Sequence, residues 1–216
     1  MEIQRTFTNQ TNRTMRKLFK IMIAAALMLI SASAYAQLSV GAGYLNTTLL
    51  EKQGSLSSGE NFNGLYIEAE WKINIYSDFI GFTPGVRYDF GTTSVEGVSW
   101  NEQYVDIPLM FDFGYSFSDS FRFFAFTGPS ISLGISSNIK SSGVKVNMYE
   151  FTGEYLDGVA DYGRFDLMFG YGIGADICGR VRIKVALDYG LLNRMKNNLG
   201  SVTHRNLIRL GAAYLF

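Results

Sequence analysis

The stretch "LYIEAEWKINI", residues 65–75, alternates between two kinds of side chain over its whole length. A period of two places successive side chains on opposite faces of a β-strand. Glu68, Glu70 and Lys72 therefore share one face, and the other face is wholly apolar. The apolar positions are Leu65, Ile67, Ala69, Trp71, Ile73 and Ile75.

Similar alternation marks eight segments, and the composition suits strands, with 15% aromatic residues, 23 Gly and only 3 Pro. Each of the segments reaches the roughly 9–11 residues that a tilted strand needs to cross a bilayer. They lie near residues 38–46, 64–76, 80–90, 103–115, 121–135, 164–177, 181–190 and 204–216.

The connections between these segments alternate in length. Short ones fall at 76–80, 116–120 and 178–180, and long ones fall at roughly 47–63, 91–102, 136–163 and 191–203. Short periplasmic turns and longer outer loops are typical of outer-membrane barrels. We therefore predict an all-β fold, an eight-stranded antiparallel up-and-down transmembrane β-barrel with both ends of the barrel segment in the periplasm.

A soluble β-sandwich or lipocalin-like barrel also has alternating strands, but it carries its charges on the outside. Here the alternation places the charges together on the predicted inner face, as a lipid exterior requires. Because the interior of eight strands is just filled by side chains, we expect ion pairs to plug the lumen. The predicted lumen charges are Glu68, Glu70, Lys72, Arg87, Asp89, Asp106, Asp112, Arg122, Asp166, Asp176, Arg182, Lys184, Asp188 and Arg209.

The N-terminal region reads "MRKLFKIMIAAALMLISASAYAQ" over residues 15–37. Basic residues, a short apolar run and an A-x-A site in this order predict a secretory signal peptide. The apolar run is too short for a transmembrane helix. We expect residues 1–36 to be an extension and cleaved signal with Met15 as the start, cleavage between Ala36 and Gln37, and a barrel domain over residues 37–216.

Charge and rare residues limit the function. Without residues 1–36 the chain has 14 basic and 18 acidic residues, which argues against nucleic acid as a partner. Cys178 is the sole cysteine and His204 the sole histidine, so neither an intramolecular disulfide nor a Cys/His metal cluster is expected. We expect no cofactor.

Two glycine-rich or aromatic stretches have structural interpretations. The glycines of "GYGIGAD", residues 170–176, recur at every second position and open no helix, so they are not a nucleotide loop. They are expected to make room in the lumen for Phe124, Phe126 and Met168. At the C-terminus, Tyr214 and Phe216 are expected to lie in the periplasmic aromatic girdle with other aromatic residues near the short turns.

Several stretches resemble the PorT-like outer-membrane β-barrel family. They are "YVDIPLMFDFGY" (104–115), "FAFTGPSISLGI" (124–135), "FDLMFGYGIGAD" (165–176), "DYGLLNR" (188–194) and "HRNLIRLGAAYLF" (204–216). The final strand also resembles the signal that the outer-membrane assembly machinery recognises, which implies a role for Tyr214 and Phe216 in assembly. Members of this family share the fold but not one function. One branch assists a secretion system, and no residue here marks that branch.

Three functions follow as hypotheses. The first is a monomeric, non-enzymatic barrel in the outer membrane of a Gram-negative bacterium, with outer-membrane lipid around it and a structural or surface-binding role in its outer loops. Loop 136–163, which mixes aromatic and acidic residues, would bind an unknown surface ligand or fold over its own rim. The alternatives are a lipid-modifying acyl hydrolase or transferase using His204 and Ser201, and a small diffusion pore.

Overall fold

The computed structural model of the chain describes residues 36–53, 56–77, 79–150, 162–195 and 201–216. Residues 37–216 form one compact unit. The predicted signal peptide and the middle of loop 136–163 lie outside the described residues. Within the described part, no helix is long and apolar enough to cross a membrane.

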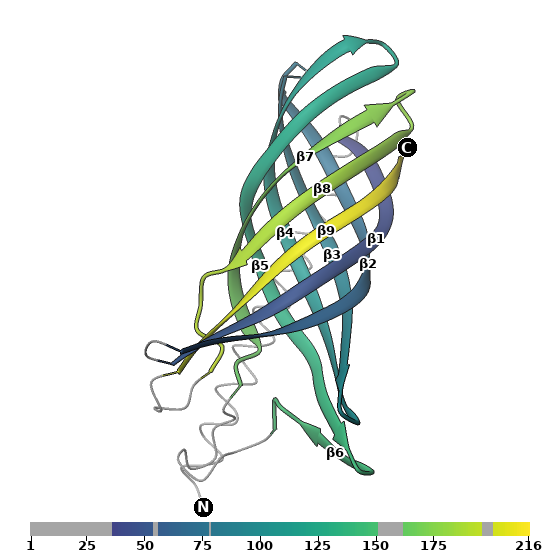
Figure 1. The fold of residues 1–216 in the computed structure, drawn as a ribbon. Coiled ribbons are helices and arrows are strands. Elements are labelled where there is room, and N and C mark those ends of the chain that lie inside the picture. The colour runs from purple at the N-terminus through teal and green to yellow at the C-terminus, as the bar shows by residue number, and fades with distance from the viewer. Residues whose placement is uncertain (1–35, 54–55, 78, 151–161, 196–200) are drawn as a thin grey trace, which may run out of the picture. The chain divides into compact units, whose positions relative to one another are not determined.

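In these described ranges the chain forms nine antiparallel strands, which are drawn in Figure 1. Their bounds are β1 Ala36–Gln53, β2 Leu56–Tyr76, β3 Ile80–Val95, β4 Val98–Ser118, β5 Phe121–Ser141, β6 Val144–Asn147, β7 Phe165–Ile177, β8 Val181–Gly190 and β9 Ser201–Leu215.

Eight of these strands form a closed ring. Each strand pairs with the next along the chain, except that β5 pairs with β7, and β1 closes the ring by pairing with β9 from Ser39–Leu215 to Gln53–Ser201. The ninth strand, β6, pairs only with the end of β5. Closure leaves the barrel wall without an unpaired edge, as a membrane requires. The predicted eight-stranded up-and-down barrel is confirmed.

Several strands are longer than predicted, and three expected loops are wrong in extent. Residues 47–63 were expected to be a long loop, but β1 continues to Gln53 and β2 begins at Leu56. Residues 91–102 were expected to be a long loop, but β3 and β4 stay paired up to Val95 and Val98. The two residues between them, Glu96 and Gly97, have φ values of 49° and 82°, which fits the type I′ turn of a tight hairpin. Likewise β5 and β6 extend the pairing into loop 136–163 around Ser142 and Gly143.

The alternation fades in these extensions although the pairing continues. Val95 and Val98 are both exposed beside polar neighbours, because the hairpin ends enclose no core. A strand with two solvated faces has no reason to keep a period of two. The sequence pattern therefore reports where a strand has two different surroundings, and it underestimates the length of the strand.

The polarity of the barrel is the reverse of that of a soluble protein. In the stretch 65–75, Leu65 and Ile67 are 66% and 61% exposed, whereas Glu68 and Glu70 are buried at 5% and 3%. The same arrangement holds around the ring, where exposed large side chains outside the barrel are apolar and most buried polar ones inside it are charged. An apolar exterior around a charged interior is stable only where the surroundings are apolar too.

The short turns and both ends of the ring lie at one end of the barrel, which we call the short-turn end. The hairpins β1–β2, β3–β4 and β5–β6 lie at the other, the hairpin end. At the short-turn end, Phe216 is 71% exposed and its N–H donates to the Leu38 carbonyl at 2.9 Å, while Leu215 points inward at 3% exposed. Tyr115, Phe117 and Tyr214 add further exposed rings there.

Glycine at two inward positions of β7 is required by close approach. A Cβ on Gly172 would lie 2.4 Å from the Phe126 ring, and one on Gly174 would lie 2.5 Å from the Phe124 ring. Both distances are shorter than a van der Waals contact. The predicted role of these glycines beside Phe124 and Phe126 is confirmed.

Candidate functional site

The lumen holds most of the charged side chains that the fold buries. All fourteen residues predicted to face it are buried. The structure adds three that the sequence analysis missed, Glu102, Arg194 and Arg205. The described buried residues include nine carboxylates and eight basic side chains, so the interior is close to neutral.

Two of the missed residues lay in segments expected to be loops, Glu102 in 91–102 and Arg194 in 191–203. Arg205 could have been found, because it shares the odd-numbered face of β9 with Leu207 and Arg209. Its position near the predicted start of that strand concealed it.

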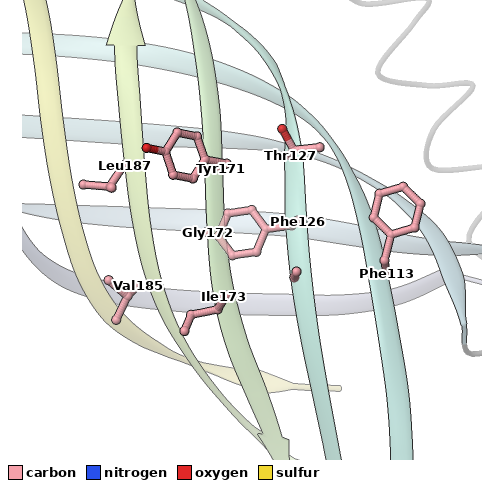
Figure 2. A pocket seen from close by; sticks show the side chains of 9 residues that line it. Phe113, Phe126, Thr127, Tyr171, Gly172, Ile173, Val185 and Leu187 are labelled. Atoms are coloured by element: carbon pink, nitrogen blue, oxygen red, sulfur yellow. The ribbon is translucent and has the colours of Figure 1, made fainter.

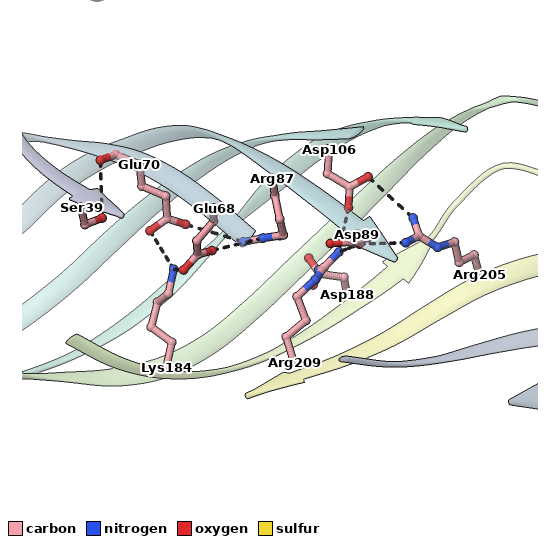
Figure 3. A network of polar contacts seen from close by, with 10 residues as sticks. All are labelled: Ser39, Glu68, Glu70, Arg87, Asp89, Asp106, Lys184, Asp188, Arg205 and Arg209. Carbon is pink, nitrogen blue, oxygen red and sulfur yellow. Dashed lines mark hydrogen bonds and ion pairs between the residues drawn. The ribbon is translucent and has the colours of Figure 1, made fainter. Parts of the chain in front are cut away.

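The first of three ion-pair clusters lies toward the hairpin end. We call it the upper cluster, because we take the hairpin end, at the bottom of Figure 1, as the top of the barrel. It consists of Asp89, Asp106, Asp188, Arg205 and Arg209 (Figure 3). Arg209 Nη2 lies 2.6 Å from Asp89 Oδ2 and 2.7 Å from Asp106 Oδ2, and its Nη1 donates to Asp188. Arg205 Nη2 lies 2.9 Å from the same Asp89 oxygen. Three carboxylates thus surround two guanidinium groups, which leaves one negative charge in excess.

The middle cluster is neutral. It pairs Glu68 and Glu70 of β2 with Arg87 of β3 and Lys184 of β8 (Figure 3). Lys184 Nζ lies 2.7 Å from an oxygen of each glutamate, and Arg87 Nε donates to Glu68 Oε2 at 3.2 Å. These contacts join strands far apart in the sequence across the lumen, as a plug requires.

The lower cluster lies at the short-turn end and consists of Lys72, Asp112, Arg122, Asp176 and Arg182. Arg182 binds Asp176 with two nitrogens, at 2.7 and 3.0 Å, and Arg122 contacts both Asp176 and Asp112. Counting only the described residues, this cluster holds three basic side chains and two carboxylates.

An apolar layer contacts the middle and lower clusters. Met110, Phe124, Phe126 and Ala186 pack together inside the barrel. The void that this layer shares with the charged residues around it has a volume of about 10 Å³, which is about the minimum for one water molecule. The interior at this height is filled by side chains.

Asp166 is the one predicted lumen charge outside these clusters. Its Oδ1 accepts a hydrogen bond from the Leu192 N–H at 3.2 Å. It therefore ties the connection after β8 to the start of β7.

An aromatic cap closes the hairpin end above the upper cluster. We define the cap as Tyr104, Tyr149, Tyr162, Glu102 and Arg194. The Arg194 guanidinium lies over the rings of Tyr104 and Tyr162, at 4.9 and 4.7 Å from their centroids, and donates to the Gly163 carbonyl at 2.7 Å and to the Tyr149 hydroxyl at 3.1 Å.

Glu102 organises the hydroxyls of the cap. Its two oxygens accept hydrogen bonds from Tyr104 at 2.6 Å, Ser137 at 3.1 Å and Tyr162 at 3.2 Å. Burial raises the pKa of Tyr162 well above its ordinary value, and the Glu102 charge raises it further. Tyr162 therefore remains a neutral donor. Since Tyr149 and Tyr162 both belong to loop 136–163, the described ends of that loop fold over their own rim, one of the two outcomes expected for it.

A small cup opens beside the cap. Its volume is about 70 Å³, and its apolar wall comes from Leu49, Trp100, Met148, Tyr162 and Met195. Glu51 and Glu60 also line it. Thr203 lines it too, and its buried hydroxyl has no hydrogen-bond partner among the described residues. Aromatic faces beside carboxylates make a cup that favours a cation.

A larger apolar hollow of about 450 Å³ lies on the outer wall of the barrel, over β4, β5, β7 and β8 (Figure 2). Small outward residues, Ala125 and Thr127, lie between the bulkier Phe113 and Tyr171. The hollow belongs to the apolar exterior.

The residues proposed for lipid chemistry are not brought into a catalytic arrangement in the described part. His204 lies on the outer side of β9, partly exposed, and its Nδ1 has no hydrogen-bond partner among the described residues. The Ser201 side chain lies outside the described residues. No three His, Cys, Asp or Glu of the described ranges could hold a metal ion.

Comparisons with known proteins support the fold. No family model matches the chain, and no curated protein matches it, so the PorT-like resemblance stays a prediction. Among solved structures, neisserial surface protein A is similar, with a TM-score of 0.50, 10% identity, and coverage of 83% of this chain and 97% of that one.

Two further solved structures have slightly lower similarity. The attachment invasion locus protein Ail of Yersinia pestis gives a TM-score of 0.48 with 13% identity over 84% of this chain and 99% of that one. The outer membrane enzyme PagL gives 0.47 with 11% identity over 82% and 98%. At such low identity the likeness to neisserial surface protein A shows the fold alone.

Proposed function

We propose that this protein is an integral outer-membrane β-barrel with a closed lumen, whose hairpin end faces the outside and binds a surface ligand. The observation that carries the proposal is the reversed polarity of a closed eight-stranded ring: apolar side chains cover the outside and seventeen charged ones are buried. Exposing such a wall to water would be costly, whereas a bilayer matches it.

The closed lumen supports a non-enzymatic, non-conducting role. The ion pairs of the upper and middle clusters and the apolar layer fill the lumen between the two ends, and the cap covers the hairpin end. A small pore would need a continuous water path. The enzyme hypothesis would need an orienting partner for His204, and the described residues supply none to its Nδ1. Both stay as alternatives.

The cup beside the cap supports a binding role and a ligand class. A compact alkylammonium group, such as a lysine side chain of a basic protein, would place its charge near Glu51 and Glu60 and its methylenes against Trp100 and Met148. Such a site combines ion pairing with contact to an aromatic face.

Orientation can be tested with the native cysteine. Cys178 is exposed in the turn between β7 and β8 at the short-turn end, and Ser142 is exposed in the turn between β5 and β6 at the hairpin end. A membrane-impermeant maleimide should label Ser142→Cys in a Cys178→Ser background on intact cells. It should label Cys178 of the wild type only after permeabilisation, and the reverse pattern would reject the orientation.

Binding at the cup can be tested on purified protein in an uncharged detergent with an oligolysine peptide as the probe. The double variant Glu51→Gln, Glu60→Gln should weaken binding at least tenfold. The double variant Glu96→Gln, Glu150→Gln removes two exposed acids outside the cup and is the matched control. Equal loss in both proteins would mean that net charge, and not the cup, attracts the peptide.

A further inference from the structure

A polar cavity of about 360 Å³ lies at the short-turn end of the lumen. Lys72, Arg122 and Asp176 of the lower cluster line it, together with Ser116, Ser118 and Asp119 at the end of β4 and in the turn that follows. The cavity is several times larger than a water molecule, and most of its exposed lining is polar, so it has room and donors for a small solute.

Lys72 differs from the other basic side chains of the three clusters. Each of the other six has a carboxylate oxygen within 4 Å. Lys72 is 5% exposed, yet it makes no hydrogen bond or ion pair with any described residue. A buried ammonium group without a partner is unfavourable.

The neighbouring carboxylates are already engaged. Asp176 accepts hydrogen bonds from two nitrogens of Arg182 and from one nitrogen of Arg122. Asp112 accepts from Arg122 and, at 3.2 Å, from the Thr83 hydroxyl. The excess carboxylate of the lumen lies in the upper cluster, beyond the neutral middle cluster, where it cannot pair with Lys72.

We propose that this cavity binds a compact oxyanion, a phosphate or carboxylate group, whose negative charge pairs with Lys72. The anion enters from the short-turn side, because the exposed residues of the lining, Ser116, Ser118 and Asp119, lie there. Hydroxyls of Ser116 and Ser118 are available as donors on the wall. Asp119 also lines the cavity and disfavours anions of high charge. The anion then supplies the negative charge that Lys72 lacks among the described residues.

The test uses the full-length mature protein folded in an uncharged sugar detergent, with inorganic phosphate as the probe and chloride at matched ionic strength as the reference. Phosphate should raise the thermal unfolding midpoint by several degrees and bind one equivalent by calorimetry. Lys72→Met should lose the shift and weaken binding more than tenfold, while the heat-dependent gel shift shows that it still folds. Lys145→Met, an exposed lysine of β6, should respond like the wild type.

Two sources of phosphate can be separated with dioctanoyl phosphatidic acid as a second probe. Much tighter binding of this lipid than of inorganic phosphate would assign the cavity to a lipid headgroup, and equal binding would assign it to a free solute. No binding of either, or an unchanged response in Lys72→Met, would overturn the proposal. The result is independent of the hairpin-end binding proposed above, because the two sites lie at opposite ends of the barrel.

Discussion

Arg194 and Lys72 are buried cations at opposite ends of one lumen, and neither forms an ion pair with a carboxylate of the described residues. The Arg194 guanidinium lies over two tyrosine rings, and its Nη2 donates to a carbonyl and a hydroxyl, whereas its Nε and Nη1 have no hydrogen-bond partner among the described residues. Lys72 has no such partners and borders a cavity. The difference follows from their chemistry, because a planar, weakly hydrated guanidinium stacks on rings, whereas an ammonium needs water or an anion. The cap therefore stabilises the fold, and the polar cavity at the short-turn end is available for binding.

The largest effect is expected at Phe216, which is exposed, whereas the neighbouring apolar side chain of Leu215 is buried. Phe216 faces outward among the other exposed aromatic rings of the short-turn end, and Leu215 lines the polar cavity inside it. Phe216→Ser should strongly reduce the amount of folded barrel in the membrane, since the outward face carries the contacts with lipid and the predicted assembly signal. Leu215→Ser should reduce it much less. The heat-dependent gel shift measures both, and equal losses would show that this face is not what assembly requires.

The next largest effect is expected in the upper cluster. Unlike Lys72, the arginines of this cluster form ion pairs with several carboxylates. Arg209→Met leaves Asp89, Asp106 and Asp188 with one guanidinium, Arg205, near them. We expect a loss of about 3–5 kcal/mol in the free energy of unfolding, the usual cost of breaking a buried pair. Urea unfolding in detergent or bilayers measures it. A loss below about 1 kcal/mol would mean that water already reaches the cluster.

A smaller effect is expected in the cap, where charge is kept and shape is changed. Arg194→Lys retains a cation, but an ammonium group cannot lie flat over the rings of Tyr104 and Tyr162 while donating to Gly163. We expect the free energy of unfolding to fall by about 2–3 kcal/mol, which is the usual cost of leaving a buried polar group without a hydrogen-bond partner. Arg164→Lys is the control, because Arg164 stacks on Tyr149 but is exposed, and should cost less than about 1 kcal/mol. Equal losses of unfolding free energy in the two variants would show that the contacts of Arg194 in the cap do not stabilise the fold more than an exposed stacked arginine does.

The smallest effect is expected for Lys72→Met without phosphate. Removing an unpaired buried charge costs little or stabilises, so the unfolding free energy should rise or stay within about 1 kcal/mol of the wild type. Urea unfolding in phosphate-free buffer is the measurement. A loss as large as that of Arg209→Met would show that Lys72 has a partner within the fold.

The difference between the two ends also explains what the sequence could predict. The fourteen lumen charges were found because lipid on one side and a packed interior on the other impose a strict period of two, as in β2 around Glu68 and Glu70. Arg194 and Glu102 were not found, because they lie where the chain leaves the bilayer region and contacts with distant tyrosines decide their burial. That Lys72 lacks a partner could not be predicted, since pairing depends on the strand register and on which carboxylates other cations already hold.

Conductance tests the central claim, a lumen closed by its own ion pairs, most directly. Purified protein in a planar bilayer should show no steady conductance, because side chains fill the cross-section at the apolar layer and at the middle cluster. The variants Lys184→Glu and Glu68→Lys, which reverse lumen charges, should also fail to conduct selectively. A stable wild-type conductance whose ion preference reverses in these variants would contradict the closed lumen and establish a pore.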